Sequence, residues 1–454
     1  MSLRRRVGRW VSVLAIGVAA QAASADNLVQ ALSDAYANSG LLEQNRAVLR
    51  AADEDVAQAN ARLLPVLNWA TSVSRQSPVA PGGDKVQGSV SLSAQLTIYD
   101  AGANRFAIAA QKELVLGTRQ GLRSVEQQVL FRAVQAYTAI NTANALINLR
   151  ENNLRLLTQE QRAAQDRFEV GEVTRTDVAL AQARLAEARS LLVSARGDLD
   201  QARAEFEAAV GRPAGSLAAV GPAPVSRTEA EAEAIAVRNH PDILQARYNV
   251  SAGELSIERA RAAYRPQGTL RAQTGIDFEG NTGRSVTLEF GGPIYQGGAL
   301  TSAYRQAAAR RDEARADLHI TVDDVLNQVS QAWAQREVAT ARIAASELQV
   351  RAARVAFQGL QEEFGLGART TLDVLNAEQD LQDARAALIS AQVAEIRAAY
   401  QLLFSMGLLT VEHLRLGITT YDPEAYYNAV KDAPVRKVSP QGQKLDRIIK
   451  SLGR

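Results

Sequence analysis

The sequence predicts a mainly helical protein with a small membrane β portion, built from two internal repeats. Proline is absent from residues 82–212 and 294–422, where the good helix formers Ala, Leu, Gln, Arg and Glu predominate. The stretch RFEVGEVTRTDV at 167–178 recurs as EFGLGARTTLDV at 363–374. Between the helical stretches, two segments alternate apolar and polar residues with a period of two. These patterns predict long helices, a duplication and paired strands.

The first 25 residues have the three parts of a cleaved secretory signal peptide. Arginines at 4–6 precede an apolar run over 11–20, and small residues precede the expected cleavage after Ala25. A membrane anchor is the alternative, but the run is shorter than the about 20 apolar residues that cross a bilayer as a helix. We therefore expect the mature chain in the periplasm, the outer membrane or the medium.

Composition argues against several kinds of site. The chain has no cysteine, so neither a disulfide framework nor a lipid on an N-terminal cysteine is available. Its three histidines lie far apart in the sequence, which disfavours a histidine-based metal site. The formal net charge is +2, and basic residues are interspersed with acidic ones, so no nucleic-acid footprint is visible. We expect no cofactor, no bound metal and no nucleic-acid partner.

Two proline-free segments, 104–168 and 300–363, each predict one very long helix. A helix of about 65 residues, at about 1.5 Å per residue, is about 100 Å long. No globular domain of this size has so long a core. The helices must therefore pack along one another in a coiled-coil-like layer.

The duplication extends beyond the repeated turn. Residues 38–65 match 239–266 without a gap, and TIYDAG at 97–102 matches PIYQGG at 293–298. Five extra residues in the first copy are assigned to a hairpin loop around SPVAPGGDK. The expected organisation is a signal peptide at 1–25, repeat 1 at 26–212, a linker at 213–227, repeat 2 at 228–410 and a periplasmic, equatorial tail at 411–454.

Each repeat is expected to contribute one β-hairpin, at about 66–98 and about 268–294. In the second, Val286, Leu288 and Phe290 alternate with polar residues. About ten residues tilted by about 45° rise about 23 Å, close to the apolar band of an outer-membrane barrel. Four strands cannot enclose a lumen, since small barrels need about eight. Several chains must therefore assemble the barrel, with polar positions such as Arg271 and Glu289 facing its interior.

The two copies of the turn contain the residues of a tight reversal between helices. Gly171 and Gly367 are expected to act as helix C-caps, because glycine tolerates positive φ. The next helices are expected to begin at capping boxes. These boxes pair Thr174 with Asp177 and Thr370 with Asp373. Capping is the simplest role of these aspartates and does not exclude a second one.

The layout resembles the TolC-type outer-membrane efflux and secretion duct family. The carrying motifs are LTIYDAG and GGPIYQGG at the barrel-to-helix junctions and the two turn sequences, within a match over about 27–410. The junction residues are Tyr99, Pro293, Tyr295, Gly297 and Gly298. The resemblance implies a homotrimer with one 12-stranded barrel in outer-membrane lipid and a helical periplasmic tunnel. A periplasmic adaptor (membrane fusion protein) and an inner-membrane ABC or proton-driven transporter would dock at the closed end.

The resemblance also implies a periplasmic gate at the repeated turns. In the family, links between the helical hairpins hold the tunnel shut, and acidic residues surround the aperture. By motif position, Arg369 would pair with Asp177 and Thr176, while Asp373 would form a ring of carboxylates. Such a ring favours cations.

Two positions depart from the family pattern at this gate. Phe364 stands where the pattern has a tyrosine whose hydroxyl makes one link. Asn376 stands at a second acidic ring position. The resemblance therefore implies a looser gate that rests on the Arg369–Asp177 pair and has one acidic ring.

Three other functions compete with a duct for type I secretion. An enzyme would need a convergent set of nucleophile, base or metal ligands, and no such motif is present. A periplasmic adaptor has long helices and strands, but usually one helical hairpin and no need for membrane-height strands. Multidrug efflux is compatible with the same duct and stays open as the alternative route.

Overall fold

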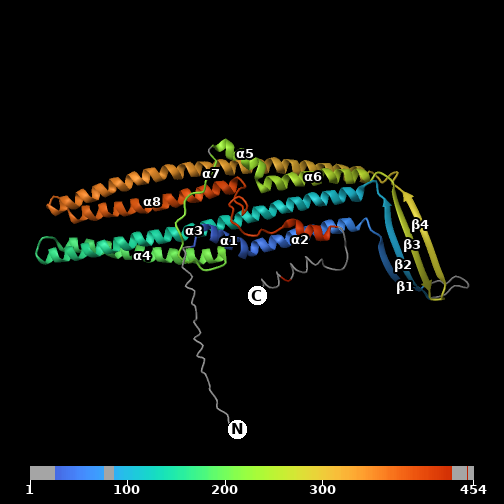
Figure 1. Ribbon diagram of the computed structural model, residues 1–454, viewed down its shortest axis with the longest axis horizontal. Coiled ribbons are helices and arrows are strands. Elements are labelled where there is room, and N and C mark those ends of the chain that lie inside the picture. Colours follow the sequence, from blue (N-terminus) through green and yellow to red (C-terminus); the bar gives the residue numbers. More distant parts are fainter. Residues whose placement is uncertain (1–25, 76–85, 227, 432–446, 448–454) are drawn as a thin grey trace, which may run out of the picture.

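The computed structural model describes residues 26–75, 86–226, 228–431 and 447. Long helices run along the molecule and a β-sheet lies at one end, which confirms the mainly helical fold (Figure 1). The expected signal peptide and the SPVAPGGDK loop lie outside the described residues, as does most of the tail beyond 431. Among the helices that are described, none is both long enough and apolar enough to cross a membrane.

Two 67-residue helices form the long axis, α3 (Ala103–Glu169) and α7 (Ala299–Gly365), and they match the two long helices expected from the sequence. Four shorter helices lie alongside them: α2 (Gly40–Ala61), α4 (Arg175–Val210), α6 (Pro241–Ala262) and α8 (Thr371–Ser405). We call this layer of long and shorter helices the rods. Helix α3 packs against α2, α4, α6 and α8, whereas α7 packs against α6 and α8. The hairpins α3–α4 and α7–α8 both turn at the end far from the sheet (Figure 1).

The sheet has four antiparallel strands in the order β1-β2-β3-β4. They are β1 (Val66–Arg75), β2 (Val86–Tyr99), β3 (Gln267–Asp277) and β4 (Thr282–Gly291). Trp69 lies opposite Leu92, and Leu270 opposite Leu288, so the alternating apolar residues share one face. On the other face, Arg271 donates to Gln95 Oε1 at 3.1 Å. The sheet is open, and every residue of its edge strands β1 and β4 is exposed.

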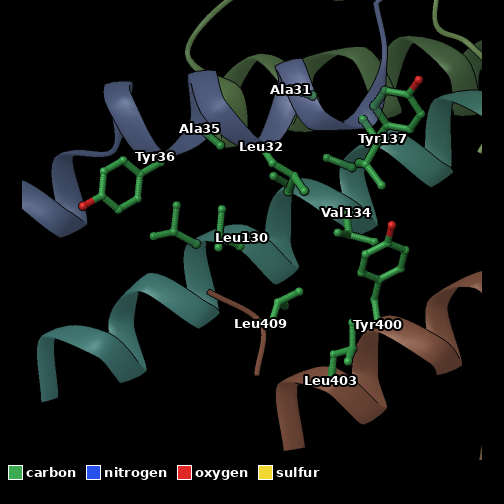
Figure 2. Packing of buried hydrophobic residues seen from close by; sticks show 14 of the residues in the cluster. Ala31, Leu32, Ala35, Tyr36, Leu130, Val134, Tyr137, Tyr400, Leu403 and Leu409 are labelled. Atoms are coloured by element: carbon green, nitrogen blue, oxygen red, sulfur yellow. The ribbon is translucent and has the colours of Figure 1, made fainter. Parts of the chain in front are cut away.

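Short elements surround the middle of the rods: α1 (Leu28–Asn38), α5 (Glu229–Asn239), α9 (Pro423–Val430) and the segment 406–421. The main hydrophobic core lies beneath α1, α5 and the segment 406–421, whereas α9 packs against α2. Leu32 from α1, Leu130 and Val134 from α3, and Leu403 from α8 are all at most 2% exposed (Figure 2). This core holds α1 and the segment 406–421 against one side of the helical layer.

Candidate functional site

The two helix tips have the same backbone geometry. Gly171 follows the end of α3 with φ 82°, and Gly367 follows the end of α7 with φ 78°. The Gly171 N–H donates to Phe168 O at 3.0 Å, and the Gly367 N–H donates to Phe364 O at 2.9 Å. Both glycines therefore satisfy carbonyls of the last helical turn in a conformation that other residues adopt only with strain.

Both expected capping boxes are formed. The Asp177 carboxylate accepts from the Thr174 N–H at 2.9 Å and from its hydroxyl at 2.7 Å. Asp373 accepts from Thr370 in the same way, at 3.0 and 2.8 Å. The Thr174 hydroxyl, then its N–H, lowers the pKa of Asp177, and the Thr370 N–H, then its hydroxyl, lowers that of Asp373. Both carboxylates are thus ionised caps.

The first turn contacts the second through Asp177. The Thr371 side chain, at the start of α8, also hydrogen-bonds the Asp177 carboxylate and contributes to its lowered pKa. Arg369 instead donates from Nε to Glu363 Oε2, at 2.6 Å, across its own turn. Among the described residues of one chain, Arg369 therefore does not pair with Asp177 or Thr176. That pair stays a prediction for an assembly of several copies.

Phe364 makes a different link from the one that a tyrosine would supply. The Arg167 guanidinium, from the last turn of α3, lies over the Phe364 ring at 5.0 Å from its centroid. Phe364 and Arg167 line the same small pocket between the tips as Val374 and Ala181. A cation–π contact of this kind is worth about 0.5–1 kcal/mol at an exposed site. The absence of the hydroxyl at Phe364 is therefore partly offset within the chain.

Asn376 also joins the two hairpins. Its Oδ1 accepts from Arg184 Nη2 on α4 at 2.9 Å, while Arg184 Nη1 lies 3.0 Å from Glu187. Asn376 is therefore directed toward α4 of its own chain. Neither Arg167 nor Arg184 was selected from the sequence. A difference between the two repeats could have pointed to both arginines, because the corresponding residues 196 positions later are acidic. These residues are Glu363 and Asp380.

A buried carboxyl lies near this tip where α3 packs against α8. Glu378 is 2% exposed, and within the described residues neither of its oxygens has a hydrogen-bond partner. Burial, together with the charge of Glu160 on α3, raises the pKa of Glu378 to about 7. Two buried amides on these helices, Asn153 and Gln382, also have an unpartnered oxygen in the described part of the chain. Glu378 belongs to no recognisable motif and was not predicted as a functional residue from the sequence.

At the other end of the rods, the two junctions repeat each other less completely. Gly102 and Gly298 precede α3 and α7 with φ 90° and 85°. The residue before each also has positive φ, Ala101 at 52° and Gly297 at 59°. The first junction therefore places a strained alanine where the second has glycine. The Asp100 carboxylate accepts from the Gly102 N–H at 2.9 Å and helps hold that turn.

Aromatic residues mark the level of the junctions. The rings of Tyr99 and Phe290 are 6.0 Å apart, and the Tyr295 side chain is 84% exposed beside the half-buried Pro293. Exposed aromatic rings at the end of an apolar strand band are typical of the interface girdles of outer-membrane barrels.

Comparison with known proteins places this arrangement in a family. The model of the outer membrane efflux protein family matches residues 31–212 and 234–408. The outer membrane efflux protein BepC of Brucella suis biovar 1 is 35% identical over 435 residues, covering 93% of this chain and 94% of BepC. The alkaline protease secretion protein AprF of Pseudomonas aeruginosa is 31% identical over 341 residues, covering 72% of this chain and 70% of AprF.

A solved structure shows the same fold. The outer membrane protein VceC of Vibrio cholerae aligns with a TM-score of 0.73 and 23% identity, covering 84% of this chain and 96% of VceC. The family match spans both hairpins and both helix tips. The chain therefore belongs to the outer membrane efflux protein family, the TolC-type ducts of the outer membrane, which transport and are not enzymes.

Proposed function

We propose that three copies of this chain form one exit duct across the outer membrane and the periplasm, fed by a periplasmic adaptor and an inner-membrane transporter. The observation that carries this proposal is the open sheet. Its edge strands β1 and β4 are fully exposed, and Trp69, Val286 and Phe290 are each at least 66% exposed on its apolar face. Pairing β1 of one copy with β4 of the next removes the edges, and lipid covers the apolar face.

The long helices support the same assembly. Ile320, Leu348 and Val355 on α7 are 58–69% exposed, on the flank opposite the residues that face α5, α6 and α8. A second copy placed against this flank covers them and continues the helical layer around a tube. Four strands and four rods per chain, taken three times, give the barrel and tunnel of the family that this chain belongs to.

The oligomer and its location are tested together. The full chain is expressed in a Gram-negative host, the membranes are fractionated, and the mass of the purified protein is measured in detergent. We expect a trimer in the outer-membrane fraction. A monomer recovered from the periplasm would contradict the duct and favour an adaptor-like protein.

Type I secretion is the route that we propose first, and it is supported by the relative AprF, an alkaline protease secretion protein. Efflux of small molecules is the second candidate, supported by the description of BepC as an efflux protein. Deletion of the gene separates the two. A secretion duct leaves specific proteins missing from the medium with drug sensitivity unchanged, whereas an efflux duct lowers the inhibitory concentrations of drugs.

We place the periplasmic gate at the helix tips, with Arg369, Asp177, Thr176 and Asp373 at the aperture. The tips of one chain are already linked by Arg167 with Phe364, Thr371 with Asp177 and Arg184 with Asn376, so we assign the Arg369 link to neighbouring copies. The Arg369→Ala variant is expected to raise the closed-state conductance of single channels in planar bilayers. An unchanged conductance would show that Arg369 serves only Glu363 in its own turn.

A further inference from the structure

A hollow of about 660 Å³ lies between α3, α7 and α8 on the side of the helical layer away from the core. Its orientation follows from helical periodicity. Arg397 of α8 lines the hollow, whereas Ala399 and Leu402, two and five residues further on and so on the far side of the helix, are buried in or beside the core. In a closed tube, the core side carries the surrounding short helices, and the hollow faces the lumen.

Two arginines border this hollow without a balancing acid. Arg342 of α7 and Arg397 of α8 both line it, and none of its described lining residues is acidic. Within the described chain neither guanidinium forms an ion pair. Arg397 is half-buried and donates from Nε to the Thr138 hydroxyl at 2.9 Å, which fixes its position. Burial lowers the pKa of Arg397, since no anion there offsets the loss of water.

Apolar residues make up about half of the lining of the hollow, and we call the part around Phe131 its floor. Phe131 lines it and packs against Phe404 with tilted rings, whose centroids are 5.4 Å apart, and Val338 and Val393 also line it. The other polar lining residues are neutral: Gln135, Thr142, Gln335, Ser390 and Gln401. Guanidinium groups above an apolar surface are complementary to a molecule with an acidic group on an apolar body.

We propose that this hollow is a lumen site for small amphiphilic anions, with Arg342 and Arg397 holding the acidic group and the floor around Phe131 holding the apolar body. The site binds its ligand weakly and transiently, because a transported molecule must be able to leave. Three copies place these arginines as a cationic band around the tube, between the acidic tips and the barrel. The inference rests on the proposed duct, since only a closed tube makes this surface a lumen.

The chain offers a matched control on the same helix. Arg336 of α7 lies over the Trp333 ring at 5.4 Å from its centroid, and Trp333 belongs to the core side. Arg336→Gln therefore removes one positive charge per chain at the same level, outside the lumen. The test variants are Arg342→Gln alone, which changes an exposed side chain, and Arg342→Gln combined with Arg397→Gln.

The experiment is block of single-channel current in planar bilayers by naphthalenedisulfonate, a soluble anion with an aromatic body. We expect block of the unaltered channel, a half-blocking concentration about tenfold higher in the double variant, which corresponds to about 1.4 kcal/mol, and an intermediate value in Arg342→Gln. The Arg336→Gln channel should be blocked like the unaltered one. Equal block of all variants, no block at all, or equal loss in Arg336→Gln would overturn the lumen site. A protein that forms no channel would instead refute the proposed duct.

Discussion

Replacing Glu378 by glutamine should stabilise the contact between α3 and α8 near the tip, by an amount that grows as the pH rises from about 4.5 to about 7. Glu378 is 2% exposed, and within the described residues nothing hydrogen-bonds its carboxyl. When protonated, it can donate a hydrogen bond, for which the Gln382 oxygen one turn further on is an available acceptor. When ionised, it is a buried charge that faces another acid, Glu160.

The size of the effect follows from the pKa. Burial and Glu160 raise the pKa of Glu378 from 4.5 to about 7. Because the folded state holds the proton more tightly than the unfolded state, stability is unaffected below about pH 4.5 and is lost progressively as the pH rises to about 7. Since a tenfold difference in proton affinity corresponds to about 1.4 kcal/mol, the loss of stability above pH 7 is on the order of 3 kcal/mol. Glutamine keeps the shape and removes this loss.

Hydrogen exchange of the purified trimer measures the effect where it acts. At pH 8, amides of α3 and α8 near Glu378 should exchange up to about a hundredfold more slowly in Glu378→Gln than in the unaltered protein. At pH 4, where the carboxyl is protonated in both the folded and the unfolded state, the two should exchange alike. Asp380→Asn, an exposed acid two residues away on the same helix, is the matched control and should change neither. Because the variant and the unaltered protein are compared at the same pH, the intrinsic pH dependence of amide exchange cancels.

Two results would refute this reasoning. Equal slowing at pH 4 and pH 8 would mean that glutamine acts by packing and not by removing a charge. Equal slowing in Asp380→Asn would mean that any acid removed from α8 stabilises the tip.

Three further predictions concern the junction and the tips. Ala101→Gly should raise the stability of the purified protein by about 1 kcal/mol in thermal unfolding, because it relieves a positive φ at 52°; no gain would mean that the Asp100 turn already absorbs the strain. Phe364→Leu removes the ring beneath Arg167 and should raise the closed-state conductance, and a conductance equal to the unaltered channel would show that this contact does not hold the tips together. Asp373→Ala should shift the reversal potential in a salt gradient toward lower cation selectivity, and an unchanged potential would place the acidic ring elsewhere.

The long elements of the fold could be predicted because their signals are local and repeated. Helices of 67 residues without proline, and glycines at matching positions of the two turns, leave few alternatives once the duplication is recognised. The strand faces were also accessible, because a period of two places Val90, Leu92 and Leu96 on one face of β2 whatever its partner strands. The order of the strands depends on the pairing of β2 with β3, which joins residues far apart in the sequence and has no local signal.

The contacts at the tips were harder to predict for the same reason. Capping boxes lie within four residues and follow from spacing, so Thr174 with Asp177 was accessible. The Arg184–Asn376 hydrogen bond joins residues 192 positions apart, and the Arg167–Phe364 contact depends on how two hairpins pack. The family pattern predicts that Arg369 pairs with Asp177, whereas within one chain Arg369 pairs with Glu363 of its own turn. Position in a motif fixes the neighbourhood of a side chain but not its partner.

In the proposed tube, the two repeats give two kinds of contact between neighbouring helical hairpins, which we call seams. The buried acid Glu378 lies in one of them. By the 196-residue offset, α4 corresponds to α8 and α3 to α7, so the α3–α8 seam within a chain corresponds to the α4–α7 seam between copies. Glu378 and Glu160 then correspond to Gln182 and Ala356, both exposed in the single chain and neither ionisable. A rise in pH is therefore expected to weaken the seam inside each chain, and the positions that correspond to Glu378 and Glu160 in the proposed seam between copies carry no acid.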